Sequence, residues 1–405
     1  MELLAPAGNL EKLKWSAIYG ADAVYFGTEF GSLRNFAGNF SMDDAQEGLD
    51  YLHLRGKKGY VTLNIYPFSE EFEKIIDTAN TLDEMGVDAF IISDIGVIRE
   101  LSKLALKAKL FISTQANTTN YQAALAYSDM GASRVILARE LYIERIKEIA
   151  QKTKGIIETE VFIHGAVCFS YSGRCAISDY LTGYRANRGE CKHPCRWKYA
   201  LVEETRPGKY MPVFEDDRGL YLFNSKDTAL FEFLPDLIEA GVESIKIEGR
   251  MKSVHYLATV VSYYRQVLDG KNFSKEQSLE MLNRVPNRGL SAGFIKGYID
   301  ENDYQIENSG SYSESVFVGN VVEEKYDGKS VLEVRNKIYS GEILEVLNTD
   351  GSLSQIQMQS PIVTKNGQKL SEVNHSQFIL IETDLPPYTI LRRVKGLQVP
   401  QEHPE

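Results

Sequence analysis

Cysteine is scarce in this chain and unevenly placed. The 405 residues include four cysteines, and all of them lie between positions 168 and 195. Long apolar runs are also missing, because no stretch approaches the roughly 18 apolar residues that a membrane-spanning helix needs. The opening residues, MELLAPAGNLEKLKW, have neither a basic n-region nor a small-residue cleavage site, which argues against a signal peptide. We therefore expect a cytoplasmic protein, without a membrane partner, whose thiols stay reduced.

Positive charge is in short supply as well. Lysine and arginine total 45 against 56 acidic residues, so the formal net charge is −11. The whole molecule is therefore not expected to bind nucleic acid, and an RNA partner would need a local basic patch. The HExxH pattern of zinc peptidases is also absent, which excludes that class of hydrolase.

A short phrase recurs in the first 250 residues and sets the expected fold. In each copy a glycine follows an amphipathic helical stretch and precedes a short apolar strand, as suits a helix C-cap. Together with other apolar runs, the copies predict eight strands at 2–5, 20–26, 59–66, 86–92, 110–114, 131–137, 160–164 and 241–247. Alternating strands and helices predict an α/β fold, a (β/α)8 TIM-like barrel. The alternative is an open doubly wound sheet, which the lack of GxGxxG after the first strand disfavours.

The pattern changes near residue 310 to short strands separated by turn dipeptides such as Asp327-Gly328 and Asp350-Gly351. This pattern predicts a small C-terminal β-barrel. We therefore expect four parts, which are a barrel at 1–270 with a cysteine-bearing insertion at about 165–220, a connecting segment at 271–309, the β-barrel at 310–395 and a flexible tail at 396–405.

The four cysteines follow the seventh predicted strand with the spacing Cys168-x6-Cys175-x15-Cys191-x3-Cys195. They lie beyond the C-terminal end of a barrel strand, the face on which barrel active sites are built. Structural zinc usually takes closely paired ligands, and only the second pair fits that spacing. An iron–sulfur cluster tolerates unequal loops. An iron–sulfur cluster, a zinc ion and unliganded or disulfide-bonded cysteines all remain open.

Polar residues end several predicted strands, where side chains point toward a ligand. Lys246 and Arg250 are candidates to hold carboxylates. The alternative is an internal charge network that satisfies the neck of the barrel. Candidate catalytic residues are Gln115, Asn117, His164, Lys246, Glu248 and Arg250, and Asn64, Arg139 and Glu140 occupy similar positions.

Basic and aromatic residues alternate around the last two cysteines, and six cations face two acids between residues 174 and 198. Cations that displace phosphate counterions and aromatics that stack on bases are typical of an RNA-binding segment. A small anion or the charge of a thiolate-bound cluster would suit the same cations. The candidate substrate-binding residues are Arg174, Tyr184, Arg185, Arg188, Lys192, Arg196, Trp197 and Lys198.

The segment EVFIHGAVCFSYSGRCAIS at 160–178 resembles the signature of the collagenase-like peptidase family, number thirty-two among the peptidases of unknown mechanism. ELLAPAGN at 2–9, STQANTTN at 113–120, SIKIEGRMKS at 244–253 and NRGLSAGF at 287–294 resemble the same family. The resemblance spans nearly the whole chain. It implies a 4Fe-4S cluster with Cys168, Cys175, Cys191 and Cys195 as its ligands.

The extra C-terminal β-domain is similar to the branch of tRNA hydroxylation proteins. That branch implies an enzyme that forms 5-hydroxyuridine at the wobble position of the tRNA anticodon loop and depends on prephenate, a small dicarboxylate. Hydroxylation of ribosomal RNA or of a quinone precursor remains open, as does a non-catalytic RNA-binding protein whose metal staples a loop. Peptidase activity is disfavoured, because a lone catalytic cysteine would not explain its three companions.

Overall fold

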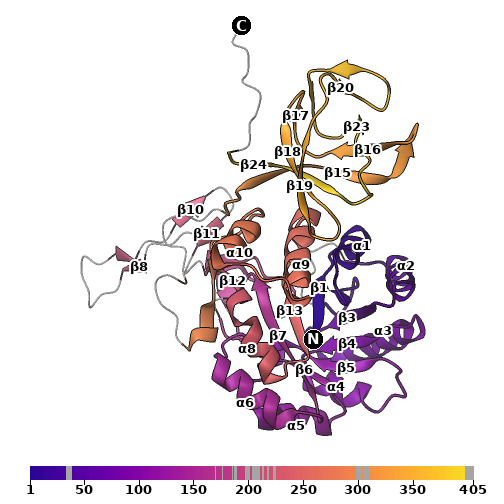
Figure 1. Ribbon diagram of the computed structural model, residues 1–405. Helices are drawn as coiled ribbons and strands as arrows, with labels where there is room; N and C mark the ends of the chain where they lie inside the picture. Colours follow the sequence, from indigo (N-terminus) through magenta and orange to yellow (C-terminus); the bar gives the residue numbers. More distant parts are fainter. Residues whose placement is uncertain are drawn as a thin grey trace. The chain divides into compact units, whose positions relative to one another are not determined.

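The computed structural model describes residues 1–32, 39–168, 170–175, 177–184, 186, 189–196, 201–202, 210–211, 214–216, 219–221, 225–297, 303 and 311–396. The chain divides into two compact units (Figure 1). The first comprises Met1–Ala17, Ala21–Lys252 and Asn287–Ser311. The second comprises Ile18–Gly20, Ser253–Pro286 and Tyr312–Glu405.

Eight parallel strands of the first unit close into a barrel, which confirms the predicted TIM-like fold. Each strand hydrogen-bonds to the next, and pairing of β7 with β13 completes the ring. Because the sheet is closed, none of these eight strands is left as an open edge. The barrel strands are β1 (Glu2–Pro6), β2 (Ala23–Phe26), β3 (Lys58–Leu63), β4 (Ala89–Ile92), β5 (Lys109–Ile112), β6 (Arg134–Ile136), β7 (Glu158–Gly165) and β13 (Ser244–Ile247).

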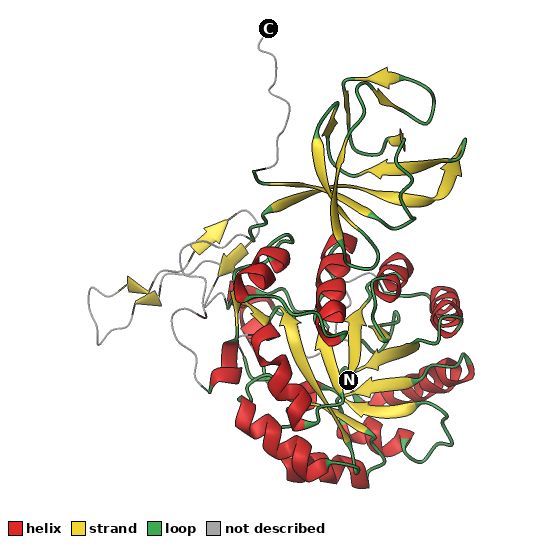
Figure 2. Cartoon of the chain, viewed as in Figure 1, coloured by secondary structure: helices red, strands yellow, loops and turns green. Residues whose placement is uncertain are grey.

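Helices lie on the outer side of these strands (Figure 2). The predicted capping box at 41–44 is present, since the Ser41 hydroxyl accepts the Asp44 N–H at 3.0 Å and the Asp44 carboxylate accepts the Ser41 N–H. No helix among the described residues is long and apolar enough to cross a bilayer. The helices that follow the strands are α1 (Leu10–Ile18), α2 (Met42–His53), α3 (Phe72–Glu84), α4 (Ile95–Leu101), α5 (Tyr121–Asp129), α6 (Ile143–Thr153) and α8 (Leu234–Ala240).

The two ends of the barrel interior differ in chemistry. Large apolar side chains such as Tyr60 and Phe111 fill its middle. Below them, at the N-terminal end of the strands, buried Arg134 contacts Glu2 at 2.5 Å and Glu160 at 3.1 Å. These buried ion pairs satisfy the charges at the N-terminal end of the barrel, whereas the active sites of such barrels lie at the opposite end. The functional site is therefore sought at the C-terminal ends of the strands.

An insertion leaves the barrel after β7. Its described elements are α7 (Ile177–Thr182), the short 3-10 helix η4 (Pro194–Arg196), β8 (Leu201–Val202), β9 (Tyr210–Met211), β10 (Phe214–Asp216) and β11 (Gly219–Tyr221). The chain then returns as β12 (Asp227–Ala229), which pairs antiparallel with the end of β7 and parallel with β14 (Leu290–Ser291). β12 and β14 therefore extend the sheet beyond β7, next to the insertion.

The second unit contains an antiparallel sheet in the order β19-β18-β24-β15-β16-β23 around its own apolar core, as expected for a separate small β-domain. Helices α9 (Val254–Leu268) and α10 (Lys275–Leu282) belong to this unit. The domain boundaries drawn from sequence at 270 and 310 remain predictions. The strands are β15 (Ser315–Tyr326), β16 (Lys329–Val334), β17 (Ile338–Tyr339), β18 (Ile343–Leu347), β19 (Leu353–Gln357), β20 (Ile362–Val363), β21 (Lys369–Leu370), β22 (Glu372–Val373), β23 (Phe378–Ile381) and β24 (Ile390–Val394).

Candidate functional site

A polar cavity of about 80 Å³ opens at the C-terminal ends of the barrel strands. Three cationic side chains line it, from the loop after β6, from β13 and from the loop after β13. Hydroxyl and amide groups from β3 and the loop after β5 complete the wall. The lining residues are Tyr25, Thr62, Asn64, Ile91, Ser113, Thr114, Gln115, Ile136, Arg139, Phe162, Lys246, Glu248 and Arg250.

Hydrogen bonds fix the guanidinium groups of this cavity. Arg250 donates to the Ser32 hydroxyl at 2.5 Å and to the Asn39 side chain at 2.9 Å. Arg139 lies over the Phe162 ring, with the guanidinium carbon 3.8 Å from the ring centroid. The Nη2 atom of Arg139 is 3.7 Å from a Glu248 carboxylate oxygen. Both arginines are therefore held rigidly enough to orient an anion.

Lys246 is a buried cation of the cavity, with 3% of its surface exposed. Its ammonium group lies 3.3 Å from Glu160 and 4.1 Å from the centroid of the Tyr25 ring. Burial lowers the pKa of Lys246, and nearby Arg139 lowers it further, while Glu160 acts in the opposite direction. Removing a charge from water disfavours the charged form, which is why burial lowers this pKa.

The four cysteines line a second and larger cavity, of about 360 Å³. All four are free thiols. A hydrogen bond between Cys168 and Cys175 raises the pKa of the Cys168 thiol and lowers the pKa of Cys175 to about 5. The Cys191 sulfur accepts the backbone N–H of His193 at 3.4 Å. Sulfur atoms that already receive hydrogen bonds are suited to carry thiolate charge.

Contacts from the barrel rim hold the cysteine-bearing loop in place. The Glu140 carboxylate accepts the Ser172 N–H at 2.5 Å and the Ser172 hydroxyl at 3.2 Å. Gly173 packs so closely on the Gln115 carbonyl that a Cβ atom would lie 2.0 Å from its oxygen. The Tyr66 hydroxyl donates to the same carbonyl at 2.6 Å. The loop is thus seated on the segments that follow β5 and β6.

The two cavities adjoin, because Thr114, Gln115 and Arg139 line both of them. The donor set of the larger cavity fits an iron–sulfur cluster. Each iron of a 4Fe-4S cluster takes one thiolate, so four thiols lining one cavity match the number of ligands it requires. Among the described residues, no three His, Cys, Asp or Glu side chains are arranged to hold a single metal ion.

The sequence profile of peptidase family U32 matches residues 8–305, and the profile of the U32 C-terminal domain matches residues 313–392. This chain belongs to peptidase family U32. The resemblance indicated by the motifs around the cysteines is thereby confirmed, and the match covers both units.

Similar proteins of other organisms match most of the chain. It is 37% identical to tRNA hydroxylation protein P1 of Bacillus subtilis (strain 168) over 85% of this chain and 82% of the relative. It is 35% identical to tRNA hydroxylation protein P of Escherichia coli (strain K12) over 87% of each. It is also 37% identical to the 23S rRNA 5-hydroxycytidine C2501 synthase of Escherichia coli (strain K12), over 66% of this chain and 39% of the relative.

The U32 fold brings together four of the six predicted catalytic candidates, since Gln115, Lys246, Glu248 and Arg250 all line the mouth cavity. Asn117 is not among the lining residues. It ends the short helix η2 (Thr114–Ala116) in a left-handed conformation, and its buried amide nitrogen makes no hydrogen bond. A catalytic role of Asn117 stays a prediction.

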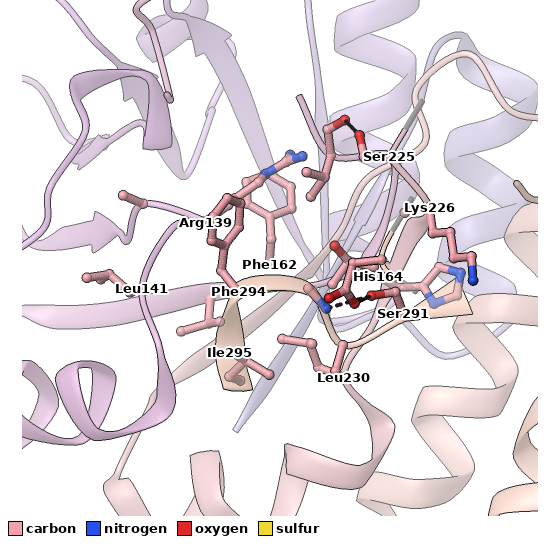
Figure 3. A pocket seen from close by; sticks show the side chains of 18 of the residues that line it. Arg139, Leu141, Phe162, His164, Ser225, Lys226, Leu230, Ser291, Phe294 and Ile295 are labelled. Carbon is pink, nitrogen blue, oxygen red and sulfur yellow. Dashed lines mark hydrogen bonds between the residues drawn. The ribbon is translucent and has the colours of Figure 1, made fainter. Parts of the chain in front are cut away.

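His164 lines a third, mostly apolar cavity of about 60 Å³ (Figure 3). Leu230, Phe294 and Ile295 line this cavity together with Lys226. Burial lowers the pKa of His164 to about 4, so its imidazole is neutral near pH 7. Cys168 lines the same cavity, so His164 lies near the cysteine-bearing loop without lining the mouth cavity.

The predicted RNA-binding segment is only partly described. Lys192 lies over the Tyr184 ring, with its nitrogen 4.4 Å from the centroid. Arg174 is exposed. For Arg196 only the backbone is described, in η4. Arg185, Arg188, Trp197 and Lys198 lie outside the described residues.

Sequence reasoning missed several lining residues of the mouth. Thr62 and Tyr25 face the cavity from within strands, and the alternation of YVTLN at 60–64 could have indicated Thr62 together with Asn64. It also passed over Ser291, in the pattern GLSAG at 289–293, which resembles a serine-hydrolase nucleophile motif. In the structure the Ser291 hydroxyl donates to Asp303 and accepts the Gly293 N–H. A carboxylate partner of that kind does not prepare a serine for attack as a histidine base would.

Proposed function

We propose that this chain is a tRNA hydroxylase that forms 5-hydroxyuridine at the wobble position, with a 4Fe-4S cluster on its four cysteines and prephenate as co-substrate. One observation carries the proposal, namely that the four-thiol cavity and the cation-lined mouth cavity share Gln115 and Arg139. The names of the relatives from Bacillus subtilis and Escherichia coli support hydroxylation of tRNA as the reaction class.

Cys168, Cys175, Cys191 and Cys195 would hold the cluster, which supplies one-electron chemistry or a Lewis-acidic iron when it is bound. Glu140 and Gln115 position this loop over the mouth through the contacts to Ser172 and Gly173. The role of the barrel rim is therefore to fix the distance between the cysteines and a molecule in the mouth.

The mouth cavity supports an acidic co-substrate. Lys246, Arg139 and Arg250 present three cations there, against Glu248 as the carboxylate of the lining. Arginine recognises a carboxylate through two parallel hydrogen bonds. A dicarboxylate such as prephenate would therefore be oriented by the rigid guanidinium groups, and water would be excluded from the buried part of the cavity.

Exposed aromatic side chains on the cysteine insertion support a nucleic-acid substrate. Tyr180, on α7, has 89% of its surface exposed, and Tyr171 and Tyr184 are exposed as well. Such rings stack on bases that have left a helical stack, as in an anticodon loop. A uridine at the wobble position would have to leave its stack to reach the mouth.

The decisive test incubates anaerobically purified protein with prephenate and tRNA from a strain that lacks the gene, followed by nucleoside mass spectrometry. We expect 5-hydroxyuridine with the native protein. Cys168→Ala and Cys191→Ala should lose the brown colour and the product together. Hydroxylation by a colourless variant would contradict catalysis by the cluster, and stoichiometric zinc without activity would support a structural staple instead. Labelled water and labelled dioxygen, used in parallel, identify the source of the added oxygen atom.

A second measurement addresses RNA binding. Because stacking on an aromatic side chain contributes about 1–3 kcal/mol per base, Tyr180→Ala should raise the Kd for tRNA by a factor of roughly 5 to 150. Tyr326→Ala, an exposed tyrosine of the second unit, is the matched control and should leave the Kd unchanged. Equal affinities of both variants would exclude this tyrosine from the RNA-binding surface.

Assays with other substrates distinguish the alternative functions. Unmodified tRNA together with hydroxylated ribosomal RNA would redirect the proposal to the reaction that names the ribosomal relative. Hydroxylation of a quinone precursor alone would remove RNA from the proposal. Cleavage of gelatin by cluster-loaded protein, lost in Ser291→Ala or Cys175→Ala, would favour peptidase chemistry.

A further inference from the structure

Lys246 occupies an unusual position for a lysine. It lies on β13, its side chain is buried, and it lines the mouth cavity in which the proposed acidic co-substrate binds. The rings of Tyr25 and Phe162 lie 4.1 Å and 5.3 Å from its nitrogen. An amine enclosed by aromatic faces and open to a cavity on one side resembles the environment in which lysines act as nucleophiles.

Two carboxylates lie close to the Lys246 amine. The Glu160 Oε1 atom forms an ion pair with the Lys246 nitrogen at 3.3 Å, and the other oxygen of Glu160 accepts from Arg134 at 3.1 Å. The charge of Glu160 is thus shared with a guanidinium group below it. Glu248 is the second carboxylate near the amine, and it accepts the Tyr25 hydroxyl at 3.2 Å. Burial is the largest influence on the pKa of Lys246 and lowers it, while Glu160 and Glu248 act in the opposite direction.

The cations of the cavity provide the complementary half of a binding site. The Nε atom of Arg139 is buried and makes no hydrogen bond. Arg250 lines the same cavity. A ligand carboxylate would gain charge-assisted hydrogen bonds from such groups. A molecule that carries a carboxylate next to a ketone would then present its carbonyl carbon to the amine.

We propose that Lys246 condenses with the ketone of a 2-oxo acid to form an imine, with the carboxylate held by Arg139 and Arg250. The Lys246 nitrogen bonds to the carbonyl carbon, the carbon–oxygen bond breaks, and the oxygen leaves as water with two protons from the amine. No electrons are transferred, and hydrolysis reverses the step. Glu248 is placed to carry a proton between the amine and the departing oxygen. This inference rests on the acidic co-substrate of the proposed function and identifies its reactive group.

The test traps the imine by reduction. Full-length protein is incubated with pyruvate, the smallest stable 2-oxo acid of this kind, then treated with sodium borohydride and examined by intact-mass and peptide mass spectrometry. We expect one adduct per chain, heavier by the mass of pyruvate less one oxygen atom, on Lys246. Lys246→Arg should form no adduct, whereas Lys226→Arg, which changes a lysine lining the neighbouring cavity, should form it fully.

If Lys246→Arg does not fold, two controls with the wild-type protein still test the inference. Succinate, which has carboxylates but no ketone, should suppress the adduct, and acetone, which has a ketone but no carboxylate, should form none. An absent adduct, or one spread over surface lysines, would overturn the inference. Because trapping requires neither RNA nor cluster, its result is independent of tRNA hydroxylation. Full tRNA hydroxylation by Lys246→Arg would support the proposed function and contradict the proposed imine on Lys246.

Discussion

Individual buried titratable side chains make the free energy of unfolding of this chain depend on pH. His255, on α9, stacks against Phe317 with ring centroids 5.4 Å apart, and its Nε2 atom lies 3.5 Å from Arg392. Burial lowers the pKa of His255 well below its ordinary value, and the charge of Arg392 acts in the same direction. The folded chain therefore holds this imidazole neutral, whereas the unfolded chain protonates it near pH 6.5.

This difference predicts an acid-dependent loss of stability. A depressed folded-state pKa means that the unfolded state binds more protons, so the free energy of unfolding is fully retained above about pH 6.5 and falls as the pH decreases toward the folded-state pKa. Urea unfolding of the full chain at several pH values measures this decline. His255→Gln, which retains a polar side chain without a titratable ring, should show a shallower decline. Parallel curves for the two proteins would contradict the assignment.

At the scale of elements, the seat of the cysteine loop depends on one glycine. Gly173 has a φ of +73°, and an added Cβ would lie 2.0 Å from the backbone oxygen of Gln115. A backbone carbonyl cannot move aside as a flexible side chain would. Gly183 has a similar φ of +71°, but an added Cβ there meets nothing within 4 Å. An alanine at Gly183 would therefore introduce backbone strain alone, whereas an alanine at Gly173 would add a steric clash to a similar strain.

Gly173→Ala should detach the loop from the rim and reduce both the iron bound per chain after anaerobic reconstitution and tRNA hydroxylation. Gly183→Ala carries comparable backbone strain, about 1 kcal/mol, without the clash and should keep most of its iron. Iron and sulfide analysis of the two variants measures the difference. Equal iron contents would mean that contact with Gln115 does not position the cysteines.

At the scale of the whole molecule, the second unit is assembled from segments far apart in the sequence. Tyr19 belongs to it, and its buried hydroxyl donates to the Tyr388 carbonyl at 2.8 Å, with the Leu347 carbonyl 3.3 Å away. Tyr19→Phe keeps the ring and removes the donor, which leaves buried carbonyl groups without that partner. The expected loss in the free energy of unfolding is about 1–3 kcal/mol, measured by urea denaturation. Tyr326→Phe, at an exposed site, should change stability far less, and equal losses would contradict the role of the Tyr19 bond.

Several features could be predicted from the sequence because they depend on local patterns. Glycine after an amphipathic helix and before an apolar strand, together with the other short apolar runs, predicted the eight barrel strands, and turn dipeptides predicted the C-terminal β-domain. The cysteines were grouped correctly in one insertion after the seventh strand. Periodicity determines which side chains face inward, and turn-forming residues such as glycine determine where strands end.

Tertiary structure decided which of the polar strand ends share a cavity. Asn117 and His164 follow the same strand-end rule as Gln115 and Lys246, yet they do not line the mouth cavity. The contact between Lys246 and Glu160 exists because β13 closes the barrel against β7, with a register irregularity directly after Lys246. Burial of apolar side chains is encoded residue by residue, but the distance between two charges depends on the register of strands that are remote in sequence. Only the closed ring fixes that register.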